Sequence, residues 1–412
     1  MRRPCDGWAG WIREWITRYG LSIVRVLLMS PMADRDVAGG DVTYTEALLA
    51  RPPEGVTYTT YVDALDEGSL VERGRRPRGG LPGPTDTVIL GVRGVEHGLR
   101  RAGLLFREPY SYVTVSPGAF DLVHAHLFAV RMVGTGVPLV TSSGFPLPVL
   151  YEDRFGWSHR HVAVSTVAER VLARAVGVEL PWLPPRRAAR AMVQSEHYRH
   201  QLIDAGADPD RVVVHPLGST GTAGRPRTGP PRTIGYISTG FESKGGPVVL
   251  DAFRKLLAEC PTARLIIVGS EPRRLDSSFP VGSVEWHGRV PHAEVLDSVL
   301  PRVDVLALPT RCDSGPPYVV IEALQRVIPV VASDLAWLDE GLAGPGVRRV
   351  PADPDPVSAA FHDLFDPDTY PLASRAALDL WSSRYSMAVL ADRIGGTYRA
   401  ARRASRRGAG TA

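Results

Sequence analysis

Short apolar runs alternate with helical patterns along most of the chain. The run over residues 24–29 is followed by Ser30-Pro31, by Gly39-Gly40 and by a helical pattern over 43–49. A strand, a glycine turn and a helix start are typical of the first unit of a parallel sheet. Further strands of this first half are predicted at residues 87–90, 122–124, 138–141, 161–164, 191–194 and 212–215.

A second series of the same kind begins after residues 218–231, where glycine, proline and small polar residues without an apolar period predict a linker. The chain therefore predicts an α/β protein with two doubly wound, Rossmann-like domains that face a central cleft, over residues 23–217 and 232–385. Residues 386–412 are expected to form a C-terminal helix and a basic tail. In the second half, strands are predicted at 233–237, 263–269, 284–286, 303–308 and 328–332, and helices at 246–259, 292–299 and 318–325.

Residues 1–22 form an N-terminal extension with a different, amphipathic pattern. Its aromatic and apolar residues recur at helical spacing, which is typical of a helix at a membrane interface. A helix that packs on the protein's own surface has the same pattern, so peripheral membrane contact and self-packing are both open. The residues of this stripe are Trp8, Trp11, Ile12, Trp15, Ile16 and Tyr19.

Composition indicates a folded protein of the cytoplasm. Of the 412 residues, 44% are hydrophobic and 22% are charged, which excludes a disordered chain. The net charge of +4 is accounted for by five arginines after residue 398, so nucleic acid is not an expected partner. The 3 cysteines lack the spacing of a zinc site, and no apolar run is long enough to span a membrane.

Lysine is scarce in this arginine-rich chain, because only Lys244 and Lys255 occur. Lys244 lies in a polar glycine turn between a predicted strand and the helix over 246–259. Backbone N–H groups at a helix start favour phosphate, and a lysine there adds a full charge. A similar turn follows the strand over 303–308, where prolines 316 and 317 precede a helix that carries Glu322 in its first turns.

In their order and spacing, these segments resemble the retaining glycosyltransferases of family 4, the group 1 glycosyltransferases, which have the GT-B fold. The resemblance covers residues from about 23 to 400. It rests on Gly39-Gly40, Asp121-Leu-Val-His-Ala-His126, Gln194-Ser195-Glu196, Val212-Val-Val-His-Pro-Leu-Gly218, Lys244-Gly245, His287-Gly288-Arg289-Val290, the segment 303–310, the segment 314–324 and Pro329-Val-Val-Ala-Ser-Asp334.

The resemblance implies transfer of a hexosyl or N-acetylhexosaminyl group from a nucleotide-diphosphate sugar to a hydroxyl of a natural product, small molecule or glycan. The anomeric configuration would be retained, and neither a metal ion nor a cofactor beyond the nucleotide sugar is expected. Lys244 would hold the diphosphate and Glu322 the ribose hydroxyls, with Asp313 as the third catalytic residue. The donor-binding residues implied are Gly39, Gly40, Thr239, Gly269, Gly288, Arg289, Val290, Ser314, Gly315, Pro316 and Pro317, and those on the acceptor side are His126, Ser143 and Glu196.

Three positions depart from the family pattern. Ser314 replaces a glutamate beside Asp313, Thr239 replaces a basic residue, and Ser143 stands where a histidine is usual. Arg273 or Arg274 would be placed to supply charge to a phosphate instead. These departures keep two alternatives open, namely an epimerase or hydrolase of nucleotide sugars on the same fold, and a non-catalytic partner of an active glycosyltransferase.

Overall fold

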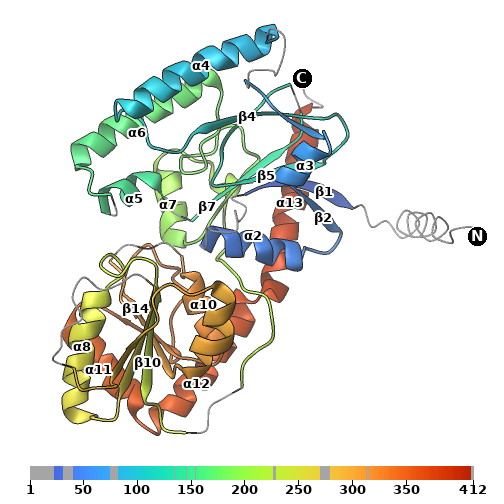
Figure 1. The fold of residues 1–412 in the computed structure, drawn as a ribbon. Coiled ribbons are helices and arrows are strands. Elements are labelled where there is room, and N and C mark those ends of the chain that lie inside the picture. Colours follow the sequence, from blue (N-terminus) through green and yellow to red (C-terminus); the bar gives the residue numbers. More distant parts are fainter. Residues whose placement is uncertain are drawn as a thin grey trace, which may run out of the picture.

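The computed structural model describes residues 23–30, 40–74, 82–134, 136–144, 146–153, 155–225, 229–269, 279–311, 313 and 315–409. Two α/β domains lie next to each other, and each has a parallel sheet between helices (Figure 1). The tryptophan stripe, Gly39, Ser314 and Arg273-Arg274 lie outside the described residues.

The first domain contains a six-stranded sheet in which every neighbouring pair is parallel. Along β1, alternate residues enter two different hydrophobic clusters, with Val26 and Leu28 on one face and Leu27 and Met29 on the other. A strand that buries both faces is typical of a parallel sheet covered on both sides. In spatial order the strands are β2 (Val56–Thr60), β1 (Val24–Met29), β5 (Leu122–His126), β7 (Leu139–Ser143), β8 (Arg190–Val193) and β9 (Val212–Val214).

A three-stranded sheet of β3 (Leu70–Glu72), β4 (Tyr110–Val115) and β6 (Ala129–Met132) extends this domain. The helices outside it are α4 (Pro84–Arg101) and α6 (His159–Val176), so the strands predicted at 87–90 and 161–164 are wrong. Both segments are short and apolar, but proline starts α4 and Ser158 caps α6, and each helix buries only one face. The domain's other helices are α2 (Gly40–Ala50), α3 (Tyr61–Asp66), α5 (Leu147–Asp153) and α7 (Glu196–Asp204).

The second domain has the strand order β12-β11-β10-β13-β14-β15, again with parallel neighbours. Its predicted strands are all confirmed, and the helices predicted over 246–259 and 318–325 agree with α8 and α10 to the residue. The strands are β10 (Thr233–Ser238), β11 (Arg264–Gly269), β12 (Val284–Trp286), β13 (Val305–Leu308), β14 (Val330–Ser333) and β15 (Val347–Val350). The helices are α8 (Gly246–Glu259), α9 (His292–Glu294, continued by a π-helical turn over Val295–Val299), α10 (Tyr318–Gln325), α11 (Pro354–Phe365) and α12 (Thr369–Leu380).

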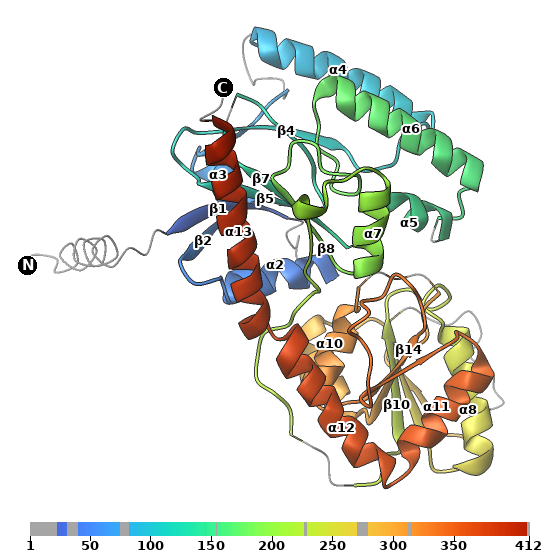
Figure 2. The same cartoon turned by 180° about the vertical axis from the view of Figure 1, so that it is seen from behind.

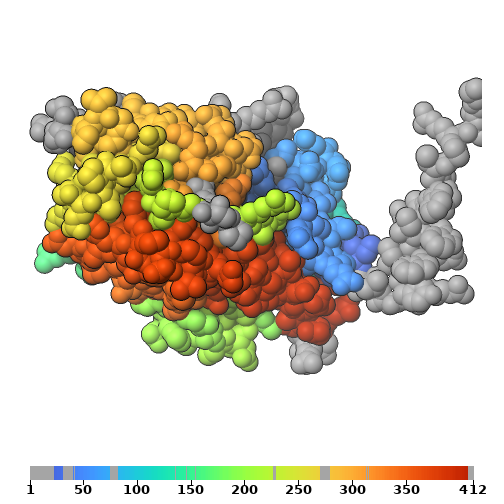
Figure 3. All heavy atoms as spheres, turned by 90° about the horizontal axis from the view of Figure 1, so that it is seen from below, coloured from blue at the N-terminus to red at the C-terminus, as the bar shows by residue number. Residues whose placement is uncertain are grey.

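The last helix, α13 (Met387–Ala409), returns from the second domain to the first (Figure 2). Seen from below, the red C-terminal segment continues from the second domain to the blue elements of the first (Figure 3). The hydroxyl of Tyr398 lies 2.8 Å from Nδ1 of His124 on β5, and Arg402 pairs with Asp121 at 3.6 Å. The sequence predicted a helix here, but its docking on the first domain comes from the tertiary structure.

Part of the predicted linker is held by the second domain. The hydroxyl of Ser219 donates to the side-chain oxygen of Gln325 at 2.9 Å and accepts a hydrogen bond from the indole of Trp381 at 2.8 Å. The amide of Gly224 donates to the carbonyl of Gln325 at 2.7 Å. These contacts anchor the start of the 218–231 segment beside α10.

Candidate active site

The second sheet changes winding direction between β10 and β13, and two oppositely charged side chains meet beyond the carboxyl ends of these strands. Lys244 follows β10, Asp313 follows β13, and Nζ of Lys244 lies 2.5 Å from Oδ2 of Asp313. Their side chains are 22% and 16% exposed. Such a switch point is where open α/β sheets bind ligands. An ammonium group has three donors, so the ion pair with Asp313 does not use all of them.

The turn that carries Lys244 is held against the neighbouring β13 loop. Gly245 caps α8 with a φ of +80°, and a Cβ atom at this position would lie 2.0 Å from the carbonyl oxygen of Pro309. Only glycine satisfies both the left-handed conformation and the close approach. Thr239 begins the same turn, directly after β10. The backbone thus brings the start of α8 to the switch point.

Gly269 and Gly288 lie together at the same edge of the sheet. The amide of Gly269, the last residue of β11, donates to the carbonyl of Gly288 at 2.7 Å. Arg289 and Val290 follow directly, the former exposed and the latter half-buried. Four of the donor-side positions implied by the resemblance therefore lie together at the carboxyl ends of β11 and β12.

Glu322 is 4% exposed and interacts with a residue that sequence reasoning missed. Nε2 of His292 lies 2.7 Å from Oε1 of Glu322. This hydrogen bond, together with the negative charges of Glu322 and Glu46, raises the pKa of His292, and burial opposes the rise. Both residues line a cavity of about 410 Å³ between α2 of the first domain and α10 of the second. His292 lies 30 residues from Glu322 in sequence, so only the tertiary packing of the second domain brings the two side chains together.

Gly315 lies where the two domains touch. Its φ is +56°, and a Cβ atom there would lie 2.1 Å from the side-chain oxygen of Gln194, at the end of β8. Its amide donates to the carbonyl of Trp337 at 3.1 Å. Pro316 and Pro317 lead directly into α10, where a Cβ atom on Gly40 would approach the ring of Tyr318 to 3.2 Å. The loop expected beside the donor sugar is therefore packed against the first domain.

The acceptor-side positions lie at the carboxyl edge of the first sheet. His126 is 2% exposed, with Nδ1 at 2.8 Å from the hydroxyl of Ser142 and its ring centroid 4.4 Å from that of Tyr44. Ser143, also buried, ends β7. Glu196 differs from both because its side chain is 51% exposed and pairs with Arg199 at 3.6 Å. The structure gathers His126 and Ser143 in the interior and leaves the Glu196 carboxylate at the surface.

Glu340 of the second domain was also missed by sequence reasoning. Its carboxylate accepts hydrogen bonds from the backbone amides of Glu196 at 3.0 Å and His197 at 2.8 Å, at the N-terminus of α7. A helix N-terminus is a favourable position for a negative charge. Glu340 thereby links the two domains across the cleft edge.

The two histidines of β5 take part in an internal hydrogen-bond network. His124 lies 2.8 Å from the hydroxyls of both Tyr398 and Ser142, and burial holds the pKa of His124 well below its ordinary value. Within the described ranges, no group of three or more His, Cys, Asp or Glu side chains is arranged to hold a metal ion. No helix in the described part of the chain is long and apolar enough to cross a membrane.

Comparison with solved structures identifies the fold. The structure of Anabaena HepE in complex with UDP and glucose matches with a TM-score of 0.53 at 14% identity, covering 91% of this chain and 99% of that one. Sucrose-phosphate synthase from Thermosynechococcus elongatus matches at 0.56 and 16%, covering 91% and 98%. A Rickettsia africae glycosyltransferase matches at 0.53 and 11%, covering 92% and 98%. The chain therefore has the GT-B fold.

The second domain also matches a family at the level of sequence. Residues 231–366, about a third of the chain, match the model of the family described as "Glycosyl transferases group 1". This segment includes Lys244, Asp313 and Glu322. The comparison with curated protein sequences gave no match.

Proposed function

We propose that this protein is a retaining glycosyltransferase that moves a hexosyl or N-acetylhexosaminyl group from a nucleotide-diphosphate sugar to a hydroxyl of a natural product, small molecule or glycan. The observation that carries the proposal is the meeting of Lys244 and Asp313 at the switch point of the second domain. The match of residues 231–366 to group 1 glycosyltransferases supports it.

The donor diphosphate would lie at the start of α8. Departure of the leaving group places charge on the diphosphate, and Lys244 together with the positive end of the helix would stabilise that charge. This positive charge lets the reaction proceed without a required metal ion. Glu322, oriented by His292, would accept hydrogen bonds from the ribose hydroxyls. The nucleotide base would lie along residues 288–290. The similar Anabaena protein is described as a complex with UDP and glucose, which supports a nucleotide-sugar donor.

The two lysines provide a matched test of donor binding. We expect Lys244→Ala to weaken nucleoside-diphosphate binding by at least about 1.5 kcal/mol, because a charge-assisted contact is lost. Lys255→Ala removes the same charge from the exposed face of α8, where Lys255 pairs with Asp355, and should leave the affinity unchanged. The best donor is first chosen by thermal shift from UDP-, GDP-, ADP- and TDP-sugars. Calorimetry with its nucleoside diphosphate then measures the affinity of both variants. Equal affinities of the wild type and Lys244→Ala would refute the assignment.

Catalysis, metal use and stereochemistry need separate measurements. With the donor known, we expect turnover to persist in EDTA and the product to keep the anomeric configuration of the donor by NMR. Abolition by EDTA would contradict metal independence, and an inverted product would contradict retention. If the donor sugar is epimerised in the absence of any acceptor, the protein would instead be an epimerase.

A non-catalytic partner is the second candidate, and the Gly315 amide favours it. Among residues 315–317 only Gly315 has an N–H group, and that group donates to Trp337 rather than into the cleft. Under this alternative, no nucleotide sugar would shift the melting temperature. If a nucleotide sugar raises the melting temperature of the wild type but not that of Lys244→Ala, the non-catalytic alternative is excluded.

We also propose that the protein acts in the cytoplasm, either free or at the membrane surface through residues 8–19. Flotation of the full chain with liposomes, compared with a variant that lacks residues 1–22, separates the two. Equal flotation of both would contradict a membrane role for this segment.

A further inference from the structure

A cavity of about 390 Å³ opens at the amino-terminal edge of the first sheet, the edge opposite to the cleft. Its wall includes Leu139 at the start of β7, Arg190 at the start of β8 and Arg211 directly before β9. Ala404 and Ser405 of α13 close another side. Because the strands are parallel, a ligand here would lie a full strand length away from the candidate active site.

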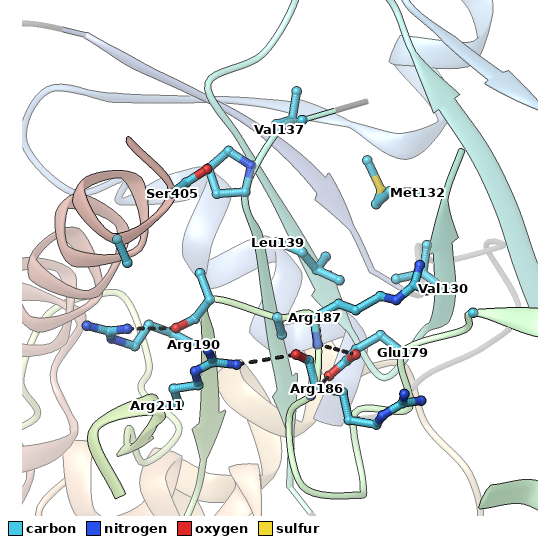
Figure 4. Close-up of a pocket in the computed structure, with 16 residues that line it drawn as sticks. Val130, Met132, Val137, Leu139, Glu179, Arg186, Arg187, Arg190, Arg211 and Ser405 are labelled. Atoms are coloured by element: carbon cyan, nitrogen blue, oxygen red, sulfur yellow. Dashed lines mark hydrogen bonds between the residues drawn. The ribbon is translucent and has the colours of Figure 1, made fainter. Parts of the chain in front are cut away.

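Arginines are gathered on this cavity. Arg186, Arg187, Arg190 and Arg211 lie along one side of it, and Met132 and Val137 lie on the other (Figure 4). One carboxylate, that of Glu179, is also in the wall. Four positive groups against one negative group leave a strongly positive cavity in a chain whose basic and acidic residues are otherwise nearly balanced, at 48 and 44.

The Glu179 carboxylate is engaged with the backbone. Its two oxygens accept the amides of Arg186 at 2.8 Å and Arg187 at 2.9 Å, so it fixes the turn from which these arginines extend. Within the described part of the chain, only Arg211 of the four arginines forms an ion pair with a carboxylate, that of Asp208 at 3.7 Å. The wall is therefore built to present positive charge.

Two of the guanidinium groups are oriented by the backbone. Nη1 of Arg190 donates to the carbonyl of Ala189 at 2.7 Å, and Nη1 of Arg211 donates to the carbonyl of Arg186 at 3.3 Å. Each guanidinium has five N–H donors, so most remain available. The planar arrangement of these donors matches the oxygens of a phosphate group. Aliphatic side chains, among them Leu139 and Val137, provide an apolar surface elsewhere in the wall.

We propose that this cavity is a second ligand site, which binds a phosphate-bearing small molecule with its phosphate on the arginines and its carbon skeleton on the apolar side. The phosphate is that of a free metabolite or of a lipid headgroup, since both present the same oxygens. The ligand would contact the β7 and β8 strand starts and α13 at once. Because α13 joins the domains, binding would also hold the end of this helix on the first domain.

The test uses pyrophosphate as probe and calorimetry on the full chain. We expect one binding event to survive in Lys244→Ala, which affects only the cleft, and to weaken at least about tenfold in Arg187→Gln/Arg190→Gln. Glutamine keeps the polar chain and removes the charge. Arg160→Gln/Arg170→Gln is the matched control, because both residues are exposed on α6 and the charge change is equal. Thermal unfolding of each variant checks that it is folded.

A second arm distinguishes the source of the phosphate. Vesicles of phosphatidylcholine with and without phosphatidic acid are floated with the same variants. Binding that requires phosphatidic acid and is lost in Arg187→Gln/Arg190→Gln assigns the headgroup, and pyrophosphate binding without flotation assigns a free metabolite. The proposal is overturned if neither probe binds, if all binding disappears in Lys244→Ala, or if the α6 control weakens binding as much as the cavity variant. None of these outcomes depends on transferase activity.

Discussion

Acid should loosen the contact between α13 and the first domain. Nε2 of His215 lies 2.8 Å from the hydroxyl of Thr397 on α13. Burial, and next the positive charge of Arg393, lower the pKa of His215 to about 4. His124 contacts Tyr398 of the same helix, and burial together with His126 and His215 lowers its pKa in the same direction.

The sign and size of the effect follow from proton linkage. The fold disfavours the charged imidazole, so below the ordinary histidine pKa of about 6.5 the unfolded chain binds more protons than the folded one. The stability contributed by neutral His215 is therefore complete above about pH 6.5 and is lost as the pH falls towards 4. A pKa of about 4 corresponds to a loss of about 2 kcal/mol at about pH 5.

Urea unfolding of the wild type and of His215→Gln, at about pH 7.5 and about pH 5, measures this loss. Glutamine does not titrate but can still bond to Thr397. We expect the wild type to lose about 2 kcal/mol more than the variant between the two pH values. If both proteins lose the same free energy of unfolding, His215 does not titrate as the structure indicates, and the reasoning is refuted.

Three further predictions concern single contacts. Asp339→Ala should lower the free energy of unfolding by about 3 kcal/mol, because the fully buried carboxylate pairs with Arg384 and accepts a hydrogen bond from the hydroxyl of Tyr385 at 2.5 Å. Urea unfolding measures this, and a loss below about 1 kcal/mol would contradict it. Gly245→Ala should cost about 2 kcal/mol or more, through its positive φ and the clash with a backbone oxygen, and an unchanged melting temperature would show that the turn can shift. In the wild type, nucleotide affinity should fall as the pH rises through the raised pKa of His292, because the charged imidazole that orients Glu322 is then lost. In His292→Gln this fall should be absent. Calorimetry at several pH values tests this, and an unaltered pH profile would exclude a role for the residue.

Hydrophobic patterning predicted five of the six strands of the second domain but missed β15, α11 and α12, and it predicted the first domain only in part. The long helices over 246–259 and 318–325 have clear periods and sharp glycine or proline starts. The run Thr87-Val-Ile-Leu90 is four residues long, and such a run is compatible with a strand or with one turn of a buried helix face. The strands of the small sheet, among them Tyr110–Val115, were not predicted.

The candidate site shows the same division. Sequence reasoning named Lys244 and Glu322 from a glycine turn and a helix start, and Asp313 through the family resemblance. It missed His292, which has no motif of its own and reaches Glu322 through the tertiary fold. It also missed the contact of Gln194 with the Gly315 loop, which exists only because the two domains meet.

The α/β class, the two series of strands and the positions of the glycine turns could be predicted from the amino-acid sequence, since these depend on local periodicity and on backbone conformations that few residues adopt. The tertiary structure was needed to find the meeting of Lys244 with Asp313, the capping of α7 by Glu340, the arginine cavity and the return of α13. Each joins residues that are far apart in the chain, and such contacts depend on how whole elements pack. The scarce lysine at position 244 was visible from composition; its carboxylate partner was not.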